Sequence, residues 1–207
     1  AAEAVAAALG KRVARFVRCD ATKPADLAQA MLAAEAAFGG VDALVTRVGG
    51  AHVAPMAKTS LADWDQEVAF NLTSAFLACK AVVPYLEKRG GGAIVTTSSG
   101  YAVIPGPDRP AYTASKAGVI ALTRSLAAGL AKQKIRVNCI APGPTDTPRF
   151  RAMNGGDKGV ERVRKSMPLG EIPQPIDCAN AAIFLISDAA AQITGQVLHV
   201  NGGLIMP

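Results

Sequence analysis

The feature that most constrains this chain is the alternation of strand-like and helix-like segments along nearly all of its 207 residues. Short apolar runs rich in β-branched residues are each followed by a longer segment of helical character. We expect strands at 12–20, 40–46, 92–99, 134–143 and 195–203, and helices at Pro24–Phe38, 61–88, 111–132 and Pro175–Ile186. This order predicts an α/β fold with a doubly wound parallel sheet, covered by helices on both faces.

Ligands of open parallel sheets bind at the carboxyl ends of the strands. The residues that follow Thr46, Ser99 and Ala141 are therefore expected to face the functional site.

Composition narrows the class of protein further. Half of the residues are hydrophobic, which suits one globular domain spanning 1–207, and the chain has neither an internal repeat nor a linker. No continuous apolar run reaches the roughly 18 residues of a membrane span, and the first residues do not resemble a signal peptide. The four cysteines are widely separated and form no C-x-x-C pair, which favours reduced thiols in a cytoplasmic protein.

The formal net charge of +6 could indicate a nucleic-acid-binding protein, but the distribution of the basic residues along the chain does not support that function. Basic residues are mostly scattered and are not interleaved with aromatic residues of the kind that stack on bases. His52 and His199 are far apart and lack metal-ligand spacing, so we expect no metal site. Ser98 and Ser99 lack a G-x-S-x-G elbow, which argues against a hydrolase triad.

The segment "AYTASKAGV" sets Tyr112 four residues before Lys116. In a helix the two side chains lie on the same face. They could form an ordinary exposed pair. Alternatively, the ammonium could favour the phenolate and lower the tyrosine pKa from its usual value of about 10, which would make Tyr112 an acid/base group.

Tyr112 and Lys116 follow a strand that ends in Ser98-Ser99, and Tyr112 comes thirteen positions after Ser99. Further motifs occur in order along the chain: "CDATKPADL", "LVTRVGG", "FNLTSAF", "RVNCIAPGPTDT" and "ITGQVLHVNGG". Together they resemble the short-chain dehydrogenase/reductase family over essentially the whole chain. The resemblance implies a three-layer Rossmann-type fold and an NAD(P)-dependent oxidoreductase that interconverts secondary alcohols and ketones.

The resemblance also implies roles for individual residues. Tyr112 would be the acid/base, and Lys116 would tune it and bind the nicotinamide ribose. Ser99 would hold the substrate oxygen, and Asn71 would anchor a water in a proton path to Lys116.

Further positions match the family's contacts to NAD or NADP. Asp20 and Ala21 match a contact to the adenine ring, although Asp20 could simply cap the next turn. Gly49 matches a glycine that lets the backbone approach the cofactor, or it is an ordinary turn glycine. The loop that holds the carboxamide and phosphates would comprise Pro142, Gly143, Thr145 and Thr147, unless Pro142-Gly143 only ends a strand.

The chain also departs from the family pattern. Thr46 and Arg47 replace two asparagines, and Asn201 stands where an aspartate is frequent. No glycine-rich phosphate-binding turn occurs, so the chain resembles the family without its N-terminal β-α-β unit, and the choice between NAD and NADP cannot be read. We therefore expect an incomplete sheet, with an unpaired edge at 40–46, and weak cofactor binding by residues 1–207. The alternative function is a non-catalytic fragment or pseudo-enzyme that serves as an assembly scaffold.

Two segments suggest contacts beyond the catalytic residues. Residues 149–165 carry six basic and two acidic residues and resemble a mobile lid, whose charge either attracts an anionic substrate or is only a solvated basic face. The helices at 61–88 and 111–132 are apolar or small around much of their circumference. By resemblance they would form the interface of a homotetramer or homodimer.

Overall fold

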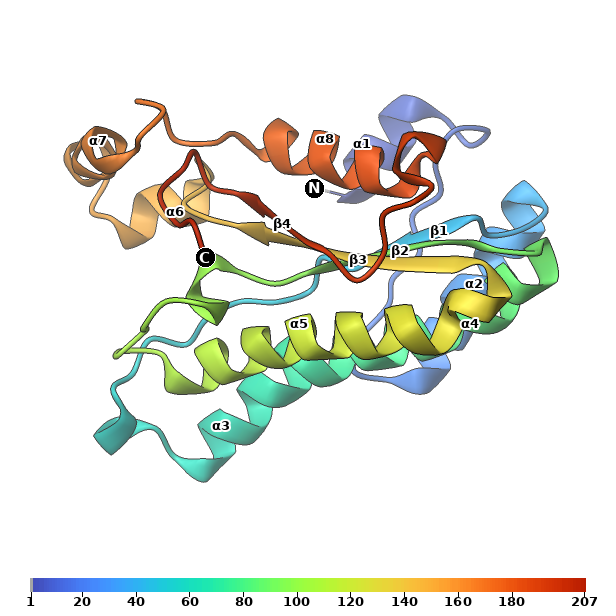
Figure 1. Ribbon diagram of the computed structural model, residues 1–207, viewed down its shortest axis with the longest axis horizontal. Coiled ribbons are helices and arrows are strands. Elements are labelled where there is room, and N and C mark those ends of the chain that lie inside the picture. The colour runs from blue at the N-terminus through green and yellow to red at the C-terminus, as the bar shows by residue number, and fades with distance from the viewer. Residues whose placement is uncertain (1) are drawn as a thin grey trace.

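The computed structural model describes residues 2–207 and contains one parallel sheet of four strands in the order β1-β2-β3-β4 (Figure 1). The strands are β1 (Ala43–Val45), β2 (Gly92–Thr97), β3 (Ile135–Pro142) and β4 (Val197–Val200). Val45 pairs with Val95, Thr97 with Ile140, and Pro142 with Val200. The α/β fold with a parallel sheet is thus confirmed.

Helices cover both faces of this sheet. On one face lie α4 (Ser74–Arg89) and α5 (Pro110–Leu130), and on the other lies α8 (Pro175–Ile186), as Figure 1 shows. Neighbouring strand residues serve opposite faces, since Ile94 packs with Val82 and Leu86 of α4, whereas Val95 packs with Leu185 of α8. The central strands β2 and β3 are therefore buried from both sides, as their continuous apolar residues require, whereas Val45 of β1 and Leu198 of β4 are exposed.

The remaining helices flank this core. They are α1 (Ala2–Leu9), α2 (Pro24–Phe38), α3 (Leu61–Val68), α6 (Pro148–Met153) and α7 (Asp157–Ser166). Short 3₁₀ turns occur at Met56–Lys58, Gly100–Ala102, Ala131–Gln133 and Asp188–Ala190. A π-helical turn at Ala69–Thr73 joins α3 to α4, so 61–89 is one continuous helical segment.

One expectation about secondary structure is wrong. Residues 12–20 form no strand, because no segment in the described part of the chain pairs with them, and Phe16 and Val17 are exposed. The stretch after β3, for which the sequence predicted no element before Pro175, contains α6 and α7. At the same time β1 forms an edge of the sheet, as the sequence predicted for 40–46.

The segment Leu61–Arg89 is long and apolar enough to cross a membrane by length and composition alone, although the sequence showed no continuous apolar run. Core helices of soluble proteins pass the same test. In this fold Cys79, Val82 and Leu86 from the segment pack against Ile94 and Val137 of the sheet, which accounts for its apolar residues.

Candidate active site

The carboxyl ends of the strands lead into a cavity of about 570 Å³. Seven of the residues expected at the site line it: Gly49, Ser99, Tyr112, Pro142, Gly143, Thr145 and Thr147. They come from the segment after β1, the end of β2, the first turn of α5, and the end of β3 with its following loop. The structure thus brings together residues that are up to 98 positions apart, from 49 to 147.

The position of α5 is fixed by a contact to the end of β2. Pro110 begins the helix, where its missing N–H costs nothing, and this places Tyr112 in the first turn. The Ser98 hydroxyl donates to the Lys116 carbonyl at 2.7 Å, and both residues are buried. This bond ties the helix that carries Tyr112 and Lys116 to the strand that carries Ser99.

The Tyr112 phenol is partly buried beside another tyrosine. Its ring meets Tyr101 edge to face at a centroid distance of 6.5 Å, and the Arg109 guanidinium lies 4.5 Å from the Tyr101 centroid. Burial raises the pKa of Tyr112, and a hydrogen bond from the Ser99 hydroxyl opposes that shift. The nearby charges of Arg109 and Arg149 also lower the pKa of Tyr112, and Glu67 raises it.

Lys116 lies behind this phenol and is only 3% exposed. Its Nζ donates to the Thr97 carbonyl at 3.0 Å and lies 5.8 Å from the centroid of the Tyr112 ring. Burial lowers the pKa of Lys116 to about 8. The interpretation of the two residues as an exposed pair is therefore wrong, and burial has a larger influence on the Tyr112 pKa than the expected effect of the ammonium.

Asn71 lies in the π-helical turn, a feature that often marks functional sites. Its side chain clamps the backbone of Gly50, since Oδ1 accepts from the Gly50 N–H at 3.0 Å and Nδ2 donates to the Gly50 carbonyl at 2.9 Å. The widened turn thereby fixes the segment that leads from β1 into the cavity.

Gly49 could not be replaced without disturbing two of these groups. Its φ of +153° suits glycine, and an added Cβ would lie 2.8 Å from both Asn71 Oδ1 and Lys116 Nζ. The bare backbone of Gly49 lets Asn71 and Lys116 lie directly against it. Gly49 lines the same cavity as Gly143, Thr145 and Thr147, whose backbone and hydroxyl groups are of the kind that a nicotinamide cofactor binds.

The loop after β3 has internal bonds of its own. The Thr145 hydroxyl donates to the Gly143 carbonyl at 3.2 Å, and Thr147 caps α6 by accepting from the Phe150 N–H at 3.1 Å. A Cβ on Gly143 would lie 2.6 Å from Asn201 Cβ, so this glycine is also needed for packing. The packing and the internal hydrogen bonds of this loop are compatible with the cofactor contacts expected of it.

Asp20 and Ala21 lie outside the cavity. The Asp20 carboxylate accepts from the hydroxyl and the N–H of Thr22, at 2.7 and 3.0 Å, and pairs with Lys23 at 3.5 Å. These bonds match the alternative of a turn cap. The adenine contact of the two residues stays a prediction.

Sequence reasoning missed the charged residue Glu67 next to the site, and it named Arg149 only as part of the basic segment 149–165. Glu67 is buried one helical turn before Asn71, and the i, i+4 spacing of the two could have signalled a pair. Arg149 lines the cavity and donates to the Ala51 carbonyl at 3.1 Å, a contact that no sequence spacing indicates. Among residues 2–207 no three His, Cys, Asp or Glu residues are grouped to hold a metal.

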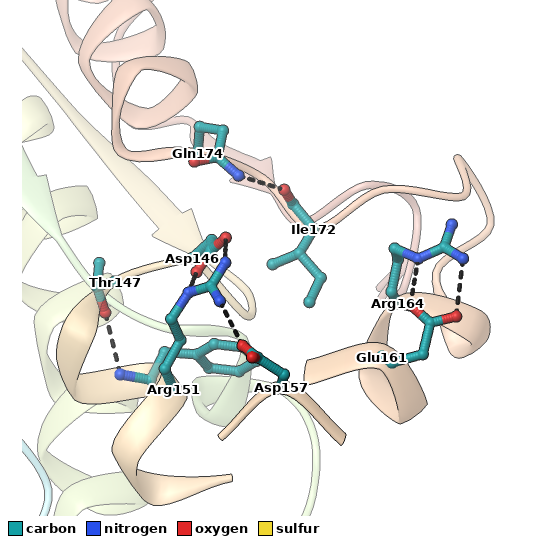
Figure 2. A network of polar contacts seen from close by, with 9 residues as sticks. Asp146, Thr147, Arg151, Asp157, Glu161, Arg164, Ile172 and Gln174 are labelled. Atoms are coloured by element: carbon teal, nitrogen blue, oxygen red, sulfur yellow. Dashed lines mark hydrogen bonds and ion pairs between the residues drawn. The ribbon is translucent and has the colours of Figure 1, made fainter. Parts of the chain in front are cut away.

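Two of the six basic residues of 149–165, Arg151 and Arg164, form ion pairs with nearby carboxylates (Figure 2). Arg151 contacts Asp146 at 2.6 Å and Asp157 at 2.9 Å, and Arg164 contacts Glu161 at 2.7 Å. These pairs link α6 and α7 to each other and to the loop before them. They leave Arg149 as the basic residue of this segment that lines the cavity.

Known proteins match the chain over almost all of its length. A family model described as Enoyl-(Acyl carrier protein) reductase matches residues 1–205. The D-threitol dehydrogenase of Mycolicibacterium smegmatis is 40% identical over 204 residues, which cover 98% of this chain and 78% of that protein. The 3beta-hydroxysteroid dehydrogenase 1 of Eggerthella lenta is 36% identical and aligns with 93% of this chain and 74% of that protein.

Solved structures agree with these matches. The aldohexose dehydrogenase of Thermoplasma acidophilum superposes with a TM-score of 0.87 at 30% identity, covering 92% of this chain and 79% of that one. A Burkholderia xenovorans protein described as a short-chain dehydrogenase/reductase superposes with a TM-score of 0.83 at 35% identity, covering 90% and 72%.

Proposed function

The chain belongs to the short-chain dehydrogenase/reductase family, and on that premise we propose that Tyr112 is the acid/base of an NAD(P)-dependent oxidoreductase that interconverts a secondary alcohol and a ketone. One observation carries the proposal. The Ser99 hydroxyl and the Tyr112 phenol line the same cavity, while Lys116 is buried directly behind them.

The chain's residues would handle the proton and the substrate oxygen, while a bound nicotinamide would accept or supply the hydride. In alcohol oxidation the Tyr112 oxygen takes the hydroxyl proton, and in ketone reduction it returns a proton to the carbonyl oxygen. Ser99 holds that oxygen by a hydrogen bond. The Lys116 ammonium favours the phenolate and offers a hydrogen bond to the ribose.

Residues 49 and 142–147 would hold the cofactor. Gly49 and Gly143 allow close backbone approach, and Thr145 and Thr147 offer hydroxyls to the carboxamide and phosphates. Asp20 and Ala21 would contact the adenine ring. The choice between NAD and NADP stays open.

The substrate is a small molecule, and we propose a neutral one. Arg151 and Arg164, two of the six basic residues of 149–165, are engaged in ion pairs, which supports the solvated-face interpretation for that part of the segment's charge. The cavity is lined by apolar side chains beside its catalytic hydroxyls: Ile104, Phe150, Met153, Val163, Leu204 and Ile205. Such walls suit an alcohol with an apolar body.

The alternative of a non-catalytic scaffold has less support. A scaffold has no need for a lysine kept buried behind a tyrosine at the end of a cavity, and burying an ammonium is costly. We also propose that the enzyme is cytoplasmic and assembles as a homodimer or homotetramer.

The proposal is tested by following nicotinamide absorbance with NAD or NADP and a panel of neutral secondary alcohols and ketones, including polyols and hydroxysteroids. We expect turnover of at least one neutral substrate. Matched ketones bearing a carboxylate should show no advantage in kcat/KM at low salt. A preference for the anionic ketones that disappears as salt rises would refute the neutral substrate class, and inactivity across the panel with both cofactors would refute the enzyme assignment.

A further inference from the structure

Glu67 is a buried carboxylate on the helix that leads to the active site. It is 8% exposed, whereas Asp65 and Gln66 beside it on α3 are exposed. Acidic side chains are rarely buried unless they are bonded to something specific, so the contacts of Glu67 indicate what it does.

Both carboxylate oxygens of Glu67 are used. Oε1 accepts from the backbone N–H of His52, and Oε2 accepts from Asn71 Nδ2 at 2.9 Å. The Glu67 carbonyl accepts from the same Nδ2 at 3.0 Å. Since Asn71 in turn exchanges two hydrogen bonds with Gly50, Glu67 and Asn71 together hold the backbone of residues 50–52.

Only the backbone of Gly49 separates this cluster from Lys116. A Cβ at Gly49 would be equally close, at 2.8 Å, to Asn71 Oδ1 and to Lys116 Nζ. In the described chain no Lys, Arg or His forms an ion pair with Glu67. Its charge therefore acts on its surroundings at short range through a partly desolvated interior.

We propose that Glu67 is a positioning residue of the active site, which locks Asn71 and residues 50–52 in place and supplies the negative charge that the buried Lys116 ammonium faces. The role rests on the proposed function, in which Lys116 acts on Tyr112. It adds a fifth side chain to Asn71, Ser99, Tyr112 and Lys116.

The charge of Glu67 has a definite direction of effect. Burial lowers the pKa of Lys116 to about 8, whereas Cys139 and Glu67 raise it. Removing the carboxylate charge should lower the pKa of Lys116 further. The other charged or titratable groups around the cluster are Arg47 near Lys116, Tyr112 on α5, and Asp63, His52 and Arg149 along a second cavity of about 290 Å³.

The test is an NMR titration of protein labelled with 13Cε-lysine, comparing the parent chain with Glu67→Gln. Lys116 should titrate near 8, well below ordinary lysines, and is assigned by its absence in Lys116→Met. In Glu67→Gln we expect its midpoint to fall by about half a pH unit or more. Amide exchange at residues 50–52 should also quicken. Asp65→Asn removes the same charge from an exposed position on the same helix and should change neither readout.

A Lys116 midpoint that is unchanged or higher in Glu67→Gln would overturn the proposal, whatever happens to activity. If that variant does not fold, Glu67→Asp decides, because it keeps the charge but shortens the side chain. The Lys116 midpoint should then stay near 8 while the backbone amide of His52 exchanges faster. An unchanged exchange rate at His52 would show that Glu67 does not hold residues 50–52 in place. Neither readout needs turnover, so a failure of the oxidoreductase assignment is distinguishable from a failure of this role.

Discussion

At the scale of single residues, burial decides the properties of the proposed acid/base pair. The spacing of Tyr112 and Lys116 predicted which groups meet, and the structure places them together. It could not predict that burial would raise the pKa of Tyr112 and lower that of Lys116, because i, i+4 spacing contains no information about what covers the helix. The phenol therefore needs help from Ser99 and nearby cations to ionise.

The depressed pKa of Lys116 makes stability depend on pH. The folded value of about 8 lies below the usual 10.5, so between these values the unfolded chain binds more protons and stability rises with pH. Lys116→Met removes this dependence. At about pH 7 the Lys116→Met variant should therefore have a higher free energy of unfolding than the parent. This difference should shrink by up to about 3 kcal/mol between about pH 7 and pH 10.5.

Urea denaturation at both pH values measures this difference. Lys80→Met, at an exposed position on α4, is the control and should differ from the parent by the same amount at both. A constant gap between Lys116→Met and the parent would show that the ammonium is not buried as described.

At the scale of elements, the helices that the apolar pattern predicted are present, and the details that shape the site were not predictable. The π-helical turn at Ala69–Thr73 has no clear sequence signal, yet it presents Asn71 to Gly50. No element was predicted for the stretch that forms α6 and α7, where Arg151 pairs with Asp146 and Asp157.

The helical segment 61–89 also leaves large apolar side chains exposed. Leu61, Trp64, Phe70 and Phe76 are each at least 38% exposed. Because scattered apolar residues are common but a series on one segment suggests a partner surface, we expect this segment to pack against a second copy. Light scattering at micromolar concentration should give a dimer or tetramer, and Phe76→Asp should shift it toward monomer.

Ile183→Asp is the matched control, since Ile183 is exposed on α8 at the opposite face of the sheet. It should leave the oligomeric state unchanged. A monomeric parent protein would contradict the assembly proposal.

At the scale of the whole molecule, the alternation of segments predicted the fold class and the edge of the sheet where the site lies. Gly49, Ser99, Tyr112 and the 142–147 loop converge there because parallel strands end at a common edge. The strand expected at 12–20 is absent because strand formation needs a partner, which local sequence does not specify. The role of Glu67 was missed for a similar reason, as its bond to His52, fifteen residues away, exists only in the folded chain.

The central claim, that Tyr112 moves the proton, is tested most directly by Tyr112→Phe on whichever substrate the parent enzyme turns over. The variant loses one hydroxyl, so kcat should fall by about 10²–10⁴-fold while the cofactor Kd stays within about twofold. Tyr85→Phe, which removes a hydroxyl outside the cavity, should retain full activity. Turnover by Tyr112→Phe within a few-fold of the parent enzyme would contradict the account.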